Sequence, residues 1–163
     1  RDAQESRGLG DVYKRQGKYR VKNYRKYMGD PTGVVYRSGW EHEVMKWCDS
    51  NPNVKRWWSE EIAIPYRKPT DGKWHRYFPD FYWEIVQDGK LKKYLIEVKP
   101  KRQTEKPKNP RSKTYLKECK EYAVNQAKFI VGREWALDHG AEFVVITERD
   151  LKIRWTGRKS KRK

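Results

Sequence analysis

The chain has 163 residues, of which 39 are lysine or arginine and 22 are aspartate or glutamate, so its formal net charge is +17. Its apolar runs are too short to cross a membrane and no secretory signal is visible, so we expect no membrane association. The positive charge exceeds what solubility requires and predicts a polyanionic partner, for which nucleic acid is the default.

The first 16 residues, "RDAQESRGLGDVYKRQ", show neither a helical nor a strand period. We expect them to be an artefactual or disordered leader. They hold four basic and three acidic residues, so the rest of the chain still carries +16. Residues 17–153 are predicted to form a single domain with a basic N-terminal arm, and 154–163 are predicted to be a basic, disordered tail.

The first predicted helix starts at Ser38 and ends at Asn51-Pro52. Its apolar stripe consists of Trp40, Val44, Trp47 and Cys48. A short strand is predicted near 59–66 and a second one over about 74–86. The hairpin signal "QDGK" then leads into a third strand, "LKKYLIEVK", over 91–99.

Residues 100–113 contain three prolines and six basic residues against one acid, which predicts a flexible basic loop. A long helix is expected from Ser112 to His139, with an apolar stripe that includes Leu116 and Ile130, and a buried strand follows in "AEFVVITE". The order helix, three strands, helix, strand (αβββαβ) predicts an α/β fold in which helices flank a mixed β-sheet.

Cys48 and Cys119 fall in helix-like apolar patterns, and we expect them to be reduced core residues rather than a disulfide. The histidines do not have zinc-site spacing, because His42-Glu43 is followed by Lys46 where a second histidine would stand.

Three acids lie against apolar sequence: Asp80 in "YFPDFYW", Glu97 in "YLIEVKP", and Glu41 in the first turn of the first helix. Pairing of the second and third strands would place Asp80 and Glu97 on neighbouring strands. Glu97 and Lys99 would share a strand face, roughly 7 Å apart. Converging carboxylates form a hard oxygen site suited to Mg²⁺ or Mn²⁺, and a nearby lysine can hold a phosphate or the attacking water.

Each acid also has a structural interpretation. "SGWE" fits a capping box, in which Glu41 reaches back to the amide of Ser38. Asp80 follows a proline and fits a turn or bulge, and Glu97 with Lys99 fits a solvated ion pair on an outer strand face. Trp74, Tyr77 and Tyr82 are candidates for stacking on unpaired bases, with core packing as the alternative.

"FPDF", a hairpin and then "LIEVKP" resemble the PD-(D/E)xK nuclease superfamily. From about residue 18 to residue 153 the chain resembles, more closely, the head-completion nucleases of tailed phages, through stretches such as "SGWEHEVMKWC", "RYFPDFYWE" and "NQAKF". It resembles the N-terminal domain of the TnsA transposon endonuclease more distantly. The resemblance implies a restriction-endonuclease-like core and cleavage of DNA that depends on Mg²⁺ or Mn²⁺.

The resemblance also implies roles for individual residues. Asp80 and Glu97 would be metal ligands, with Glu41 assisting directly or through water. Lys99 would position the nucleophilic water and the scissile phosphate. Gln126, in "NQAKF", is the candidate for a further polar site residue on the long helix, and a glutamine bonded to backbone at the edge of the core is the alternative.

The function expected from this sequence is a metal-dependent DNA endonuclease that processes packaged DNA ends during virion assembly. Its partners would be DNA and phage head or portal proteins, and its location the host cytoplasm or the virion. Two alternatives stay open. One is a non-catalytic structural head-completion protein that binds DNA or the portal, and the other is a TnsA-like or restriction-type nuclease. The sequence does not indicate the oligomeric state.

Overall fold

The computed structural model describes residues 16–150, so all but the last residue of the predicted leader and the whole of the predicted tail lie outside the described residues. The chain divides into two compact units. The first unit comprises the chain up to Glu61 together with Asp80–Lys93, and the second comprises Ile62–Pro79 and the chain from Tyr94 onward. The single domain expected over 17–153 stays a prediction.

In the first unit, the N-terminal arm packs onto helix α2 (Gly39–Ser50). The arm contains the antiparallel strands β1 (Gly17–Lys18) and β2 (Val35–Tyr36) and the short 3-10 helix η1 (Tyr24–Lys26). Asp49, which is only 2% exposed, holds the arm in place. Its carboxylate accepts hydrogen bonds from the Tyr19 hydroxyl at 2.8 Å and from the backbone N–H groups of Lys22 and Asn23 at 2.8 and 2.9 Å.

Strands β3 (Val54–Ser59) and β6 (Phe81–Gln87) pair antiparallel beside α2, with Trp57 opposite Trp83 and Ser59 opposite Phe81. Apolar side chains of α2 and of both strands form the core of this unit; they include Val44, Met45, Cys48, Val54, Trp57, Phe81 and Ile85. Burial of such side chains stabilises the fold by about 1.5–3 kcal/mol each. The predicted stripe of α2 is confirmed at Trp40, Val44 and Cys48, which are all buried.

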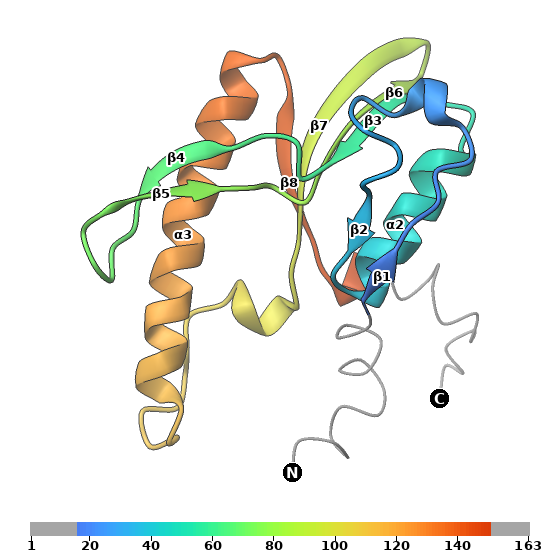
Figure 1. Cartoon of the computed structure of the whole chain (residues 1–163). Helices are drawn as coiled ribbons and strands as arrows, with labels where there is room; N and C mark the ends of the chain where they lie inside the picture. The colour runs from blue at the N-terminus through green and yellow to red at the C-terminus, as the bar shows by residue number, and fades with distance from the viewer. Residues whose placement is uncertain (1–15, 151–163) are drawn as a thin grey trace. The chain divides into compact units, whose positions relative to one another are not determined.

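In the second unit, strands β4 (Ile64–Arg67) and β5 (Trp74–Tyr77) form an antiparallel ribbon that packs on helix α3 (Tyr115–Asp138) (Figure 1). Strand β8 (Glu142–Ile146) follows α3 and runs parallel to the second half of β7 (Lys90–Val98), with Glu97 opposite Val145. A short 3-10 helix, η2 (Lys101–Gln103), begins the proline-containing segment. Among the described residues, no helix has both the length and the apolar character needed to span a membrane.

The sheet has the strand order β3-β6-β7-β8 and contains antiparallel and parallel pairs. The order α2, β3, β6, β7, α3, β8 is the predicted αβββαβ order, so the expected mixed α/β fold is confirmed, with the β4–β5 ribbon inserted after β3. The "QDGK" turn is confirmed as well. Asp88 and Gly89 have φ of +51° and +72°, the left-handed conformation that a two-residue hairpin turn requires.

Two predicted strands are wrong in their limits. The strand expected near 59–66 is instead β3, which ends at Ser59, followed by β4, which begins at Ile64. The strand expected over 74–86 is interrupted at Phe78–Asp80, so β5 and β6 belong to different sheets. Pro79 explains the interruption, because proline lacks the N–H group that a strand ladder needs.

The predicted stripe of the long helix is wrong at its two ends, because Leu116 is 68% exposed and Ile130 is 51% exposed. Its other predicted members, Cys119, Ala123 and Ala127, are half-buried. The buried residues of α3 are Asn125, Phe129, Gly132 and Ala136. The face of α3 that packs against the core of this unit therefore includes a polar residue, Asn125, and a glycine, Gly132. Gly132 is needed there because a Cβ atom at this position would lie 2.8 Å from the Phe143 ring. A count of apolar residues at helical spacing cannot identify such a face.

We predict that Asp49→Ala lowers the free energy of unfolding by about 3 kcal/mol, because it leaves a tyrosine hydroxyl and two backbone N–H groups without their acceptor. Urea denaturation at neutral pH measures the change. Asp49→Asn is the matched control: it keeps the shape and one acceptor oxygen, and we expect a smaller loss. A loss under about 0.5 kcal/mol for the alanine variant would show that the arm does not depend on Asp49.

Candidate active site

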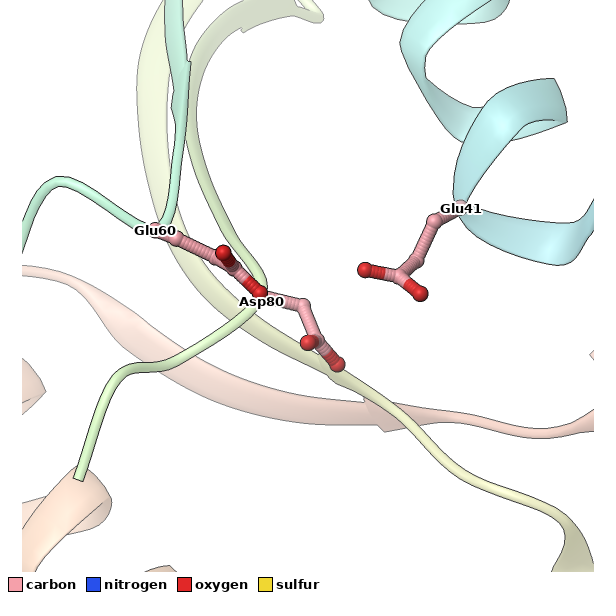
Figure 2. Close-up of side chains that lie close together, drawn as sticks. All are labelled: Glu41, Glu60 and Asp80. Carbon is pink, nitrogen blue, oxygen red and sulfur yellow. The ribbon is translucent and has the colours of Figure 1, made fainter. Parts of the chain in front are cut away.

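The start of helix α2 positions the first candidate, Glu41. Ser38 is the N-cap residue, and its hydroxyl accepts a hydrogen bond from the Glu41 backbone N–H at 3.1 Å, so the predicted N-cap is confirmed. The Glu41 carboxylate extends from the helix toward Glu60 and Asp80 (Figure 2). Glu41 is only 6% exposed, and burial of a carboxylate is unfavourable unless polar groups or cations compensate for it.

The second candidate, Asp80, lies immediately before β6, and the strand register brings a further acid beside it. Since Ser59 pairs with Phe81, the next residues along the two strands are Glu60 and Asp80. The Glu60 N–H donates to the Asp80 carbonyl oxygen at 3.2 Å, which continues the ladder by one bond. Glu60 has φ of +52°, a conformation that costs a non-glycine residue about 1 kcal/mol or more.

Glu41, Glu60 and Asp80 form an acidic cluster in the first unit. One carboxylate oxygen from each lies within 4.8 Å of the others. Like charges this close repel one another, so the cluster attracts a cation. Arg37 supplies part of that charge: its Nε lies 3.0 Å from Glu60 Oε1 and its Nη2 lies 3.2 Å from Glu60 Oε2. The pKa of the Arg37 guanidinium is raised, mainly by Glu60 and further by the charges of Glu41 and Asp80.

The other two sequence-predicted residues, Glu97 and Lys99, lie together in the second unit. Glu97 is only 4% exposed, at the end of β7. Its Oε2 accepts a hydrogen bond from the Tyr77 hydroxyl at 2.6 Å, and its Oε1 lies 3.4 Å from Lys99 Nζ. The alternative of a solvated ion pair on an outer strand face is therefore wrong.

Burial raises the pKa of Glu97 above its usual value, because a low-dielectric environment disfavours the charged carboxylate. The charge of Lys99, the Tyr77 hydrogen bond and the charge of Lys128 act in the opposite direction and favour ionisation. Glu97 thus lies in an environment where its charge depends strongly on the cations placed around it. Such an arrangement is more common at functional sites than elsewhere in a protein.

The structure brings the predicted residues together in two pairs, Glu41 with Asp80 and Glu97 with Lys99. Gln126 lies on α3 and is partly buried, and its role stays a prediction. Sequence reasoning missed Glu60, because the strand limits expected there placed this residue within a strand instead of one position after it. It also missed the bond from Tyr77 to Glu97, which spans 20 residues and has no sequence signal.

The three aromatic residues proposed to stack on unpaired bases differ in their exposure to solvent. Tyr77 and Tyr82 are buried, and the Tyr82 ring stacks on Trp58 at a centroid distance of 4.0 Å, so both contribute to packing. Trp74, at the start of β5, is 70% exposed. Of the three, Trp74 alone is open to a ligand.

Comparison with known proteins gives two matches. The model of the N-terminal domain of TnsA-like endonucleases matches residues 51–148. The head completion nuclease of Enterobacteria phage T4 is 35% identical over 142 residues, which cover 83% of this chain and 93% of that protein. No solved structure matches.

We predict that Tyr77→Phe destabilises the protein more at about pH 8 than at about pH 5. The tyrosine hydroxyl stabilises the ionised form of Glu97, so its removal raises the pKa of Glu97 further. The resulting loss of stability is complete where Glu97 is ionised and disappears as the pH falls and Glu97 becomes protonated. Urea denaturation at both pH values measures the difference.

Tyr66→Phe is the matched control, because it removes a second phenol from the same ribbon, and in the described part of the chain that phenol has no hydrogen bond to Glu97. Its effect on stability should be the same at both pH values. An effect of Tyr77→Phe that does not change with pH would contradict the assigned contact.

Proposed function

Since the chain belongs to the family of TnsA-like endonuclease N-terminal domains, we propose that it is a divalent-metal-dependent DNA endonuclease that acts in phage head completion. The observation that carries this proposal is the acidic cluster, in which carboxylates from a helix start and from two adjacent strand ends converge within 4.8 Å. Core packing does not require three carboxylates to lie so close together. A divalent cation bound among them would offset the repulsion between their negative charges.

The donor set fits Mg²⁺ or Mn²⁺. All the candidate ligand atoms are carboxylate oxygens, which hard cations prefer, whereas zinc sites favour histidine and cysteine. Glu41 and Asp80 would hold the ion, with Glu60 as a third ligand or as an acceptor for a metal-bound water. When bound, the ion would neutralise charge on the phosphate and lower the pKa of water.

Glu97 and Lys99 would also take part in the reaction, as the family resemblance implies, with Glu97 as a further metal ligand. The burial of Glu97 at the end of β7 and its contact with Lys99 support these roles.

The chemistry is hydrolysis of a phosphodiester. The oxygen of a water molecule forms a bond to phosphorus, one P–O ester bond breaks, and the products are a phosphate monoester and a hydroxyl. Lys99, as a compact ammonium close to Glu97, would orient the water and stabilise negative charge on the phosphate oxygens. The Glu97 carboxylate would hold Lys99 in that position.

DNA is the substrate because the positive charge suits a polyanion and the relatives are nucleases. The proposed setting is the host cytoplasm or the virion, where the enzyme processes the ends of packaged DNA and meets head or portal proteins. The basic segment 100–113 would add affinity for the DNA backbone without sequence preference.

We predict that the purified protein cleaves plasmid DNA with Mg²⁺ or Mn²⁺ and not with EDTA. Asp80→Asn and Glu97→Gln should each lower the rate by about 1,000-fold, because each removes a ligand charge worth several kcal/mol in the transition state. Gel analysis of nicked and linear products measures the rate. DNA binding without cleavage by the unmutated protein, under every divalent metal tested, would favour the non-catalytic head-completion role.

We predict a separate effect for Glu60→Gln. The metal concentration that gives the half-maximal cleavage rate should rise about tenfold, because a carboxylate next to the ion is lost. Glu43→Gln, in which an exposed acid on α2 paired with Lys46 is changed, is the control and should leave that concentration unchanged. Equal metal requirements for the two variants would place Glu60 outside the metal site.

A further inference from the structure

The solvent-facing side of helix α3 carries large apolar side chains that the second unit leaves uncovered. Leu116, Ile130 and Leu137 have 68%, 51% and 80% of their surface exposed. Ala123, which is half-buried, completes a row in which every seventh residue is apolar. We call Leu116, Ala123, Ile130 and Leu137 the α3 stripe. Exposed apolar side chains scattered singly are ordinary, whereas a row of them along one helix indicates an interaction surface.

The α3 stripe lies on a different face of the helix from the residues that the helix buries. Those residues, Asn125, Phe129, Gly132 and Ala136, lie where α3 packs against the rest of the second unit (Figure 1). At 100° per residue, the middle of the stripe is about 140° round the helix from the middle of the buried face. Residues seven apart are displaced by only about 20°, so the stripe runs along the helix for about 32 Å. A row with this spacing is typical of the seam between two paired helices.

The charges beside the α3 stripe indicate the kind of partner that it suits. Besides the three large stripe residues, the exposed residues of α3 are three basic and four acidic ones: Lys117, Lys120, Arg133, Glu118, Glu121, Glu134 and Asp138. This face is therefore close to neutral, although the whole chain carries +17. Nucleic acid requires a strongly basic surface, so the stripe suits a protein instead. The presence of both signs of charge allows the face to be complementary to itself.

We propose that the α3 stripe pairs with the stripe of a second copy of this chain. The two helices would be antiparallel and related by a two-fold axis that passes between residues 126 and 127. Residues whose numbers add up to 253 then lie at the same height, so Leu116 faces Leu137 of the partner subunit and Ala123 faces the partner's Ile130. The small alanine leaves room for the larger isoleucine, and the symmetry repeats each contact.

The antiparallel arrangement also brings opposite charges together beside the seam. Lys120 and Glu134 are about 40° apart round the helix, so they lie on the same edge of the stripe. Their numbers add up to 254, which places Lys120 within about 1.5 Å of the height of the partner's Glu134, and this pair occurs twice. A parallel pair in register would place equal charges at equal heights. Exposed ion pairs add little affinity, but they favour one orientation over the other.

Sedimentation velocity of the full chain, over about 1–100 µM and at about 0.15 M salt, measures the association without DNA or metal. One helix face per subunit is a small interface, so we expect a reversible dimer with a Kd of about 10 µM. Ile130→Glu and Leu137→Glu should each raise that Kd by at least about tenfold, because each places a charge in the apolar seam. Leu91→Glu changes an exposed leucine of β7 and is the matched control, for which we expect an unchanged Kd.

Charge reversal tests the orientation of the two helices. Lys120→Glu should raise the Kd by about threefold, because it places two acids together at both ends of the interface. The added change Glu134→Lys should restore the Kd of the unmutated protein, since opposite charges meet again between the subunits. Positions 120 and 134 are about 21 Å apart along one helix, so a rescue within a single chain is excluded. Circular dichroism checks that each variant keeps its helices.

The outcomes are distinct. An unmutated protein that stays monomeric at about 100 µM would overturn the proposal. A dimer that both Ile130→Glu and Leu137→Glu leave intact would also overturn it, because the subunits would then meet through another surface. Loss of the dimer in Lys120→Glu without rescue by Glu134→Lys would refute the antiparallel pairing. This inference does not rest on the proposed function, since association is measured here without cleavage.

Discussion

The antiparallel register of β3 and β6 is the constraint on which the acidic cluster depends. Trp57 is fully buried opposite Trp83 and makes an edge contact with Tyr27, so the core fixes how the two strands align. That alignment continues for one further bond, from the Glu60 N–H to the Asp80 carbonyl. A slip of one residue would turn every side chain of the strand to the opposite face. Apolar packing thus determines where the charged residues lie.

In the second unit, Glu97 is a buried carboxylate, and the free-energy cost of burying its negative charge must be offset by nearby donors or cations. The Tyr77 hydroxyl, Lys99 and Lys128 provide this compensation, and they come from β5, from the residue after β7 and from α3. The β4–β5 ribbon, which is inserted between the sheet strands, contributes Tyr77 directly and holds Lys128 through Tyr66 and Tyr77. The ribbon thus takes part in compensating the buried charge of Glu97.

Each unit contains an ion pair between a basic side chain and one of the candidate site acids. Arg37 contacts Glu60 in the first unit, and Lys99 contacts Glu97 in the second. In the first unit Arg37 offsets part of the repulsion within the acidic cluster, and in the second Lys99 offsets part of the cost of burying Glu97. Hard divalent cations prefer carboxylate oxygens, so the donor set of the acidic cluster is one that such a cation prefers.

The order of the main elements could be predicted because the signals for it are local. The stripe of α2, its N-cap at Ser38 and the "DG" turn each depend on residues a few positions apart. The predictions failed where packing overrides a local pattern. Pro79 divides what alternation suggested was one strand, and α3 buries Asn125 and Gly132 while Leu116 faces solvent.

The sequence by itself identified Asp80, Glu97 and Lys99 as candidates, because a charge inside an apolar strand pattern is costly and therefore conspicuous. It could not identify Glu60, the Tyr77 bond to Glu97 or the placement of Lys128. Those positions are separated along the chain from their partners, as Tyr77 is from Glu97 by 20 residues, and only strand register and helix packing bring them together. The sequence thus determined which charged residues stand out from their apolar surroundings, and the tertiary structure decided which side chains lie around them, because contacts between distant parts of the chain leave no local pattern.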